Sequence, residues 1–124
     1  MGDNHLTPCE AEVMGVVWQR TSATVQDVVD KIPRPLAYTT VMTTLKILED
    51  KGFVRRGAKR GRAYLYYPAF SRDSVRQSMA ASLADRLFGG SVKSMVLSLI
   101  ETESISAADL SELRSAIQTI EEGS

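Results

Sequence analysis

The sequence predicts a mainly α-helical protein that contains one small β-hairpin. Two capping boxes and a proline-containing turn divide residues 7–51 into three stretches with apolar residues at helical spacing. Residues 53–67 then form two short β-prone segments around a basic turn, and further helical stretches follow Ser71. Three helices followed by a basic hairpin are the elements of a winged helix-turn-helix, which places one helix in a DNA groove and the hairpin beside it.

The first two helices are each predicted from a capping box. Thr7, Pro8 and Glu10 supply an N-cap hydroxyl, a proline at the first helical position and an acidic residue at the third, and the helix runs to about Arg20. Its inward stripe comprises Val13, Met14, Val17 and Trp18. The segment 24–27 repeats this pattern and opens a short helix that runs through about Ile32. Its inward residues are Val25, Val28, Val29 and Ile32.

A third helix follows the two prolines of residues 33–37 and ends at Gly52. On a helical wheel its inward face comprises Val41, Leu45 and Leu48, flanked by Met42 and Thr44. The opposite face is centred on Thr43 and includes Thr39, Thr40, Lys46 and Ile47. Threonine is a poor helix former, so this face is either an accidental polar surface or one that serves binding.

The threonine face and the hairpin together predict binding to double-stranded DNA. Threonine hydroxyls donate and accept hydrogen bonds, and their methyl groups contact thymine methyls, so such a face suits the major groove. Lys46 reaches a phosphate or a guanine, and Arg60 and Arg62 at the hairpin tip reach phosphates or a minor groove. The candidate DNA-binding residues are Tyr38, Thr39, Thr40, Met42, Thr43, Lys46, Lys59, Arg60 and Arg62. Gly57 and Gly61 are interpreted as turn residues of the hairpin, and Ile47 is a chance apolar residue, a thymine contact or a packing contact with the hairpin.

Charge is sorted along the chain although its formal net value is zero. Residues 1–70 hold ten Lys/Arg and seven Asp/Glu, a net of +3, whereas residues 71–124 hold five and eight, a net of −3. Six basic and no acidic residues lie between Lys51 and Arg62. This local positive field favours nucleic acid as the partner. The alternatives are a hairpin that is basic only for solubility and a winged-helix module that binds an acidic protein.

Composition argues against several other classes of protein. No apolar run is long enough to span a bilayer, and the N-terminal residues do not resemble a signal peptide, so we expect a cytoplasmic protein without membrane insertion. One cysteine, Cys9, and one histidine, His5, make neither a disulfide nor a structural zinc site within a chain. No nucleophile–base pair or phosphate-binding glycine loop is evident, so we expect no enzymatic activity, no catalytic residues, no metal and no cofactor.

The chain after Ser71 is predicted to form helices that break at Gly89–Gly90 and restart at Ser91 and Ser106. We assign residues 1–70 to a winged-helix DNA-binding domain and residues 71–124 to a helical dimerisation region. Three small helices have little core of their own, so pairing with a second chain is expected. The apolar residues expected at the dimer interface are Leu83, Leu87, Val96, Ile100, Leu110, Leu113 and Ile117.

Several of these segments resemble the BlaI/MecI/CopY family of bacterial penicillinase and copper-responsive repressors. The matching segments are residues 6–18, 37–45, 48–53, 64–68, 88–90, 95–101 and 110–113. The resemblance implies a homodimeric winged-helix repressor that occupies an inverted-repeat operator, with the helices after Ser71 forming the dimer. The operator sequence, the regulated genes and the inducing signal do not follow from the sequence.

Two departures from the family pattern concern induction. A membrane-bound metalloprotease sensor inactivates penicillinase-type members by cutting an Asn–Phe bond, and the corresponding bond here is Ser98–Leu99. Copper-responsive members carry a cysteine-rich motif near the C-terminus that this sequence lacks. We therefore expect no copper sensing through such a motif, and Ser98–Leu99 is the candidate cleavage site. Many relatives also carry a basic residue at the position of Ile47.

Overall fold

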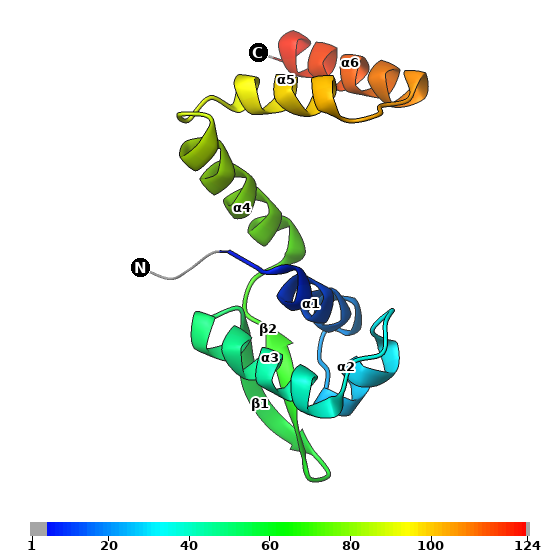
Figure 1. Ribbon diagram of the computed structural model, residues 1–124, viewed down its shortest axis with the longest axis vertical. Helices are drawn as coiled ribbons and strands as arrows, with labels where there is room; N and C mark the ends of the chain where they lie inside the picture. The colour runs from blue at the N-terminus through cyan, green and yellow to red at the C-terminus, as the bar shows by residue number, and fades with distance from the viewer. Residues whose placement is uncertain (1–4, 124) are drawn as a thin grey trace. The chain divides into compact units, whose positions relative to one another are not determined.

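The computed structural model describes residues 5–123 and has six helices and one hairpin in that range (Figure 1). In chain order the elements are α1 (Pro8–Arg20), α2 (Val25–Lys31), α3 (Tyr38–Lys51), β1 (Val54–Arg60), β2 (Ala63–Pro68), α4 (Arg72–Leu87), α5 (Val92–Thr102) and α6 (Ala107–Glu122). The fold class predicted from the sequence, mainly helical with a two-stranded hairpin, is confirmed. Among the described residues no helix is both long and apolar enough to cross a membrane.

The starts of α1 and α2 are stabilised by local side-chain hydrogen bonds. Both predicted capping boxes form: the Thr7 hydroxyl accepts from the Glu10 N–H, and the Thr24 hydroxyl accepts from the Asp27 N–H. In each box the acidic side chain accepts the N–H of the threonine in return. Gly52 ends α3 with a φ of 88°, a left-handed conformation in which a glycine carries no steric penalty.

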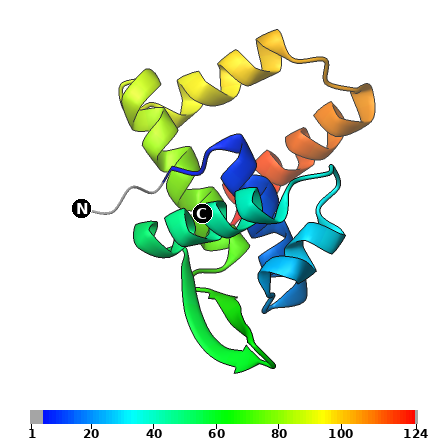
Figure 2. The same ribbon diagram turned by 60° about the horizontal axis from the view of Figure 1, so that its bottom comes forward.

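The core of the first part of the chain lies between α1, α2, α3 and the base of the hairpin. The predicted inward residues Val13, Val28 and Val41 are fully buried. Trp18 and Val29, which were also predicted to face inward, are partly buried and pack against the edge of this core. The hairpin projects from the three helices, and its far end lies beyond them (Figure 2).

The hairpin is antiparallel and pairs with a third short segment. Ala23, in the loop between α1 and α2, exchanges two backbone hydrogen bonds of 3.0 and 2.8 Å with Tyr66 of β2. The turn is narrower than the sequence indicated, because β1 continues to Arg60 and only Gly61 and Arg62 lie outside the strands. Gly61 has a φ of 67° and is a turn residue as predicted.

The interpretation of Gly57 as a turn residue was wrong, because Gly57 lies within β1, where the register shifts between Arg56 and Lys59. A glycine at this position allows the ring of Tyr67 to approach the β1 backbone closely. A Cβ atom at Gly57 would lie 2.5 Å from Cε2 of Tyr67, so the ring leaves no room for a side chain.

The chain divides into two compact units, one through Ala80 and the other from Ala81. The start of α4 belongs to the first unit, since Val75 is buried in its core and Met79 packs against that core. The contact boundary therefore follows Ala80, whereas the sequence placed a boundary at residue 70, where the hairpin ends. The N-cap serines predicted for the later helices accept the expected N–H bonds at 3.0–3.1 Å: Ser71, Ser91 and Ser106.

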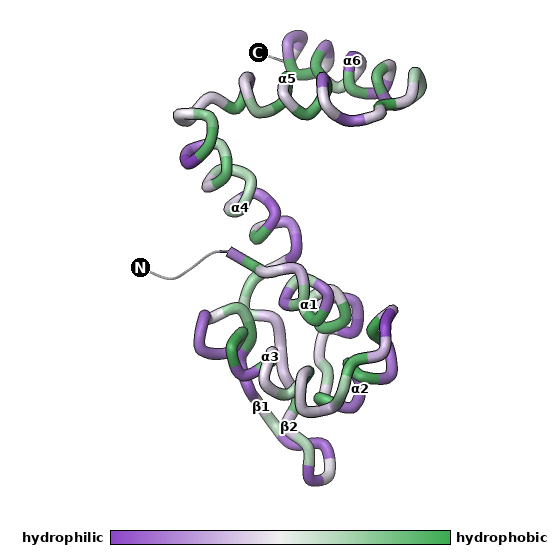
Figure 3. The backbone as a smooth tube through the Cα atoms, viewed as in Figure 1, coloured by the Kyte–Doolittle hydropathy of each residue, from purple (hydrophilic) through white to green (hydrophobic). Residues whose placement is uncertain are grey.

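The second unit has almost no buried side chains. Neither α5 nor α6 contains a buried residue, and Ala84 is the buried apolar residue that the described part of this unit contains. Apolar and polar residues alternate along the three C-terminal helices (Figure 3). These helices therefore keep their apolar side chains accessible instead of burying them within one chain.

Candidate nucleic-acid interface

Helix α3 presents a polar face because its opposite face supplies the core. Val41, Leu45 and Leu48 are fully buried and hold the helix against α1 and α2. The side of the helix predicted to bind DNA is exposed, namely Tyr38, Thr39, Thr40, Met42, Thr43, Lys46 and Ile47. The helix is thus fixed by one face while the other remains accessible to a ligand.

Thr44 differs from the other threonines of α3 because its side chain is buried. It is 7% exposed, and its hydroxyl donates a 2.8 Å hydrogen bond to the Thr40 carbonyl oxygen. The Cys9 Sγ atom lies 3.8 Å from the same hydroxyl oxygen. A buried threonine on the flank of the core satisfies its hydroxyl through the helix backbone, so Thr44 belongs to the packing and three threonines form the outward face.

The N-terminus of α3 lacks a side-chain cap. Ala37 occupies the N-cap position, whereas α1, α2, α5 and α6 each have a capping hydroxyl. The first N–H groups of a helix have no partner within the helix, and they carry its positive dipole end. In α3 these donors suit phosphate oxygens, which helix N-termini commonly bind.

A groove of about 400 Å³ separates α3 from the hairpin. Three of its lining residues are cationic, Lys46 from α3, Arg56 from β1 and Arg62 from the turn. The aromatic lining residues are Tyr38, Tyr64 and Tyr66. Within residues 5–123, Lys46 and Arg62 have no ion-pair partner, so their charges are available to an anion in the groove.

The ring of Tyr64 contacts two cationic side chains of the hairpin, Arg56 and Lys59. The Arg56 guanidinium carbon lies 4.5 Å and the Lys59 Nζ 4.9 Å from the centre of its ring. These are cation–π distances, and Tyr64 itself is 41% exposed. The ring therefore holds Arg56 and Lys59 on one surface of the hairpin.

The basic run from Lys51 to Arg62 is partly neutralised by acidic partners. Lys51 Nζ lies 2.8 Å from Glu10 Oε1, and Arg56 Nε lies 3.7 Å from Glu49 Oε2. Sequence spacing gave no signal for the first pair, because Glu10 lies 41 residues from Lys51 on α1. The positive field of the hairpin is consequently weaker than the count of basic residues suggested.

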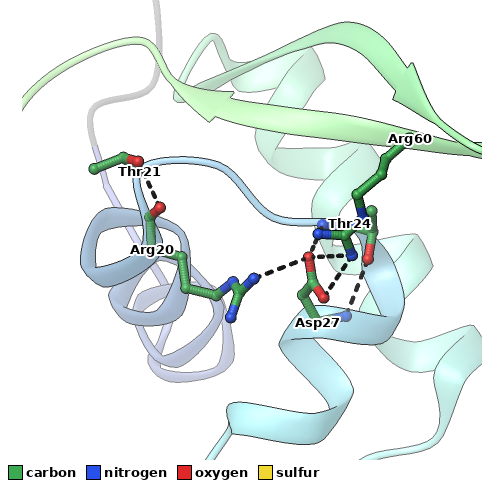
Figure 4. A network of polar contacts seen from close by, with 5 residues as sticks. All are labelled: Arg20, Thr21, Thr24, Asp27 and Arg60. Carbon is green, nitrogen blue, oxygen red and sulfur yellow. Dashed lines mark hydrogen bonds and ion pairs between the residues drawn. The ribbon is translucent and has the colours of Figure 1, made fainter.

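Arg60, predicted to contact DNA, is directed toward α2. Its Nη2 atom lies 2.8 and 2.9 Å from the two carboxylate oxygens of Asp27, and Arg20 Nη2 approaches Asp27 Oδ2 at 3.5 Å (Figure 4). The Thr24 N–H is the main influence that lowers the pKa of Asp27, burial opposes it, and both arginines lower the pKa further. Asp27 was identified from the sequence only as a capping residue.

The residues predicted for dimerisation lie on accessible surfaces of the C-terminal helices. Leu83, Leu87, Val96, Ile100, Leu113 and Ile117 are exposed by 36–69%, and Leu110 is half-buried. The Ser98–Leu99 bond lies inside α5, where the Ser98 carbonyl oxygen accepts a 2.8 Å hydrogen bond from the Thr102 hydroxyl. Leu99 is 50% exposed.

Comparison with known proteins places the chain in a family. The protein family described as "Penicillinase repressor" matches residues 6–119. The transcriptional regulator BlaI of Mycobacterium tuberculosis is 36% identical over 118 residues, which cover 92% of this chain and 83% of that protein. The penicillinase repressor of Bacillus licheniformis is 27% identical over 110 residues, covering 87% and 85%.

The fold also resembles a solved structure. A structure that describes how 6-hydroxynicotinic acid regulates DNA binding by Bordetella bronchiseptica BpsR superposes with a TM-score of 0.52 at 14% identity, covering 98% of this chain and 83% of that chain. This likeness concerns the fold alone. The relatives found by sequence are transcription regulators, which are not enzymes. Because the family match extends over residues 6–119, the chain belongs to the penicillinase repressor family of transcriptional repressors.

Proposed function

We propose that this protein represses transcription as a homodimer bound to an inverted-repeat operator, with α3 of each chain in the major groove. The observation that carries the proposal is the division of α3 into a buried apolar face and an exposed threonine face. Thr39, Thr40 and Thr43 on that face have the hydrogen-bonding groups and methyls that read base edges. Such an operator lies in the bacterial cytoplasm, where we place the protein.

The groove between α3 and the hairpin supports a position for the DNA backbone. Lys46 and Arg62 line it without ion-pair partners among the described residues, and the N–H groups of the first turn of α3 lack a side-chain cap. We assign phosphate contacts to Lys46, Lys59 and Arg62, and base contacts to the threonines. Tyr38 and Met42, 47% and 45% exposed, add apolar contacts at the start of α3.

A salt titration of duplex binding tests the electrostatic part of the proposal. The logarithm of the association constant should fall linearly with the logarithm of salt concentration, and Arg62→Ala should reduce the slope by about 1. Arg76→Ala is the matched control, because Arg76 lies on α4 and pairs with Asp73, and it should leave the slope unchanged. Absence of binding to promoter DNA at low salt would favour the protein-interaction module instead.

A second experiment tests whether α3 reads sequence. Thr43→Ala should weaken binding to the operator by about 1–3 kcal/mol and leave binding to a random duplex nearly unchanged, because a lost base contact affects only the specific complex. Lys46→Met should instead weaken both complexes. If Thr43→Ala weakened both equally, Thr43 would be a backbone contact and another residue would have to supply the discrimination.

We propose further that a membrane metalloprotease sensor induces the system by cutting the Ser98–Leu99 bond. The bond is in the dimerisation region, and its cleavage would separate α6 from α4 in each chain. Because the bond lies within a helix, α5 must open locally before a protease can bind it in an extended form. Incubation with membranes that contain such a sensor should yield a fragment that ends at Ser98, and an uncut chain under inducing conditions would refute this route.

A further inference from the structure

We propose that Asp27 and Arg60 form a latch that positions the hairpin for DNA binding, and that Arg60 is a positioning residue and not a phosphate ligand. This inference rests on the proposed function and assigns Arg60 a role different from the one its sequence position suggested. It concerns the one ion pair among the described residues that joins the hairpin tip to α2.

The Asp27 carboxylate is already prepared to hold a cation. The Thr24 N–H donates to Oδ2 at 3.0 Å, and Arg20 lies 3.5 Å from the same oxygen. The Asp27 side chain is 14% exposed, so its charge is screened less by solvent than a surface carboxylate. These neighbours fix the carboxylate at the start of α2 and keep it ionised at neutral pH.

Arg60 brings the far end of the hairpin to this carboxylate. It is the last residue of β1, directly before the turn at Gly61 and Arg62. Nearer the base of the hairpin, β2 is anchored by the backbone pair between Ala23 and Tyr66. Because the register shifts between Arg56 and Lys59, the ladder between these two anchors is interrupted, and a second anchor near the tip limits how far the tip can swing.

Neutralisation by Asp27 separates Arg60 from the free cations. One guanidinium nitrogen contacts both carboxylate oxygens at 2.8 and 2.9 Å, so Asp27 offsets part of the charge that Arg60, whose side chain is 57% exposed, would present to a phosphate. Arg62, two residues later, has no ion-pair partner within residues 5–123. The latch therefore sets the position of Arg62. Arg62 supplies the positive charge that neutralises a DNA phosphate and so releases counterions from the DNA.

Salt titrations of four variants test this division of roles: Arg60→Gln, Asp27→Asn, the double variant of these two, and Arg62→Gln. Arg60→Gln and Asp27→Asn should each weaken operator binding about three- to tenfold, the loss expected when a mobile segment must be ordered on binding, with the salt slope unchanged. The double variant should bind as each single variant does, since either change opens the latch. Arg62→Gln should reduce the slope by about 1.

The opposite pattern would overturn the latch. If Arg60→Gln reduced the slope by about 1 while Asp27→Asn left affinity unchanged or raised it, Arg60 would be a phosphate ligand. Arg60→Lys retains the charge and can pair with Asp27. Under the latch it should restore most of the affinity when Asp27 is present and none in the Asp27→Asn background, whereas a phosphate ligand would be rescued in both.

A measurement without DNA keeps the latch separate from the proposed function. Amide hydrogen exchange of residues 58–63 in the full chain should become faster in Arg60→Gln and Asp27→Asn and should remain unchanged in Arg62→Gln. Unchanged exchange in the first two variants would refute the latch. Failure of the wild type to bind any duplex would refute the proposed function alone. If Asp27→Asn failed to fold because it perturbs the cap of α2, Arg60→Gln would decide the question, since Arg60 has no capping role.

Discussion

At the scale of single residues, the pair between Glu10 and Lys51 shows how one contact serves both a helix end and the core. Glu10 completes the capping box of α1, and its carboxylate also accepts a 2.8 Å hydrogen bond from Lys51 at the end of α3. The Glu10 side chain is 7% exposed. Burial acts to raise the pKa of Glu10, but Lys51 and Thr7 together lower it, and the net pKa lies below its ordinary value.

Removal of Lys51 should therefore leave a buried carboxylate with one partner fewer. We expect Lys51→Met to reduce the free energy of unfolding by about 1–3 kcal/mol, measured by urea denaturation at pH 7. Arg34→Met is the control, because Arg34 pairs with Glu12, which lies on α1 as Glu10 does, and the Arg34 side chain is 51% exposed. Loss of this exposed pair should cost less than about 1 kcal/mol. Equal losses in the two variants would contradict a special role for the Glu10 pair.

The lowered pKa of Glu10 also gives a pH dependence with a definite sign. A carboxyl whose folded pKa is depressed stabilises the fold above its unfolded pKa, and this contribution is lost as pH falls through the folded value. Glu10→Gln should consequently make the free energy of unfolding less dependent on pH below the unfolded pKa of about 4.3. Denaturation curves at pH 3 to 7 would measure the difference.

At the scale of elements, the hairpin depends on a glycine that its strand propensity would not select. Gly57 lies in β1 beneath the ring of Tyr67, and glycine normally weakens a strand. The ring occupies the space that a side chain at position 57 would need. A larger residue at position 57 would restrict the backbone more than glycine does. It would also prevent the close contact between the two strands.

Two opposing effects decide the result of Gly57→Ala. Restricting the unfolded chain stabilises by about 0.4–1 kcal/mol, whereas overpacking costs about 1–3 kcal/mol. We expect net destabilisation of about 1 kcal/mol in thermal denaturation. In a Tyr67→Ala background, where the clash is absent, the same substitution should become neutral or stabilising. A control is Gly15→Ala in α1, where the new methyl group would meet no atom within 4 Å apart from its chain neighbours and the helix's own backbone, and the protein should gain stability.

At the scale of the whole molecule, the two compact units differ in how they use their apolar residues. The first unit buries them among α1–α3 and the hairpin base, while α5 and α6 bury none. Ile117 and Ile120 are 54% and 71% exposed. A surface of this kind is expected to be covered by another protein surface, which supports the proposal of a homodimer.

Leu113→Asp tests the dimer, because it introduces an unpaired charge into the proposed interface. Sedimentation should show a monomer at concentrations where the wild type is dimeric, since desolvating that charge is strongly unfavourable. Operator affinity should fall sharply with it, as two half-sites are no longer bound together. Ser115→Asp, on the opposite side of α6, should remain dimeric. A wild type that is monomeric at micromolar concentration yet represses fully would contradict the dimer.

Features that depend on neighbouring residues followed from the sequence by itself. The starts of α1, α2, α4, α5 and α6 were predictable because a capping hydroxyl and the N–H that it binds lie three residues apart, as at Thr24 and Asp27. The inward face of α3 was predictable because helical periodicity places Val41, Leu45 and Leu48 on one side whatever they pack against. The same local logic predicted the fold class and the exposed threonine face.

Only the tertiary structure decided which side chains meet across the chain. Arg60 and Asp27 are 33 residues apart, and Lys51 and Glu10 are 41 apart, so no local period relates them. The sequence does not distinguish a basic residue that faces solvent from one that faces a carboxylate, so the count of basic residues did not indicate the acidic partners of Lys51, Arg56 and Arg60. The role of Gly57 likewise depends on a ring from the opposite strand. These contacts follow from how the elements pack, which sequence patterns along a single element do not contain.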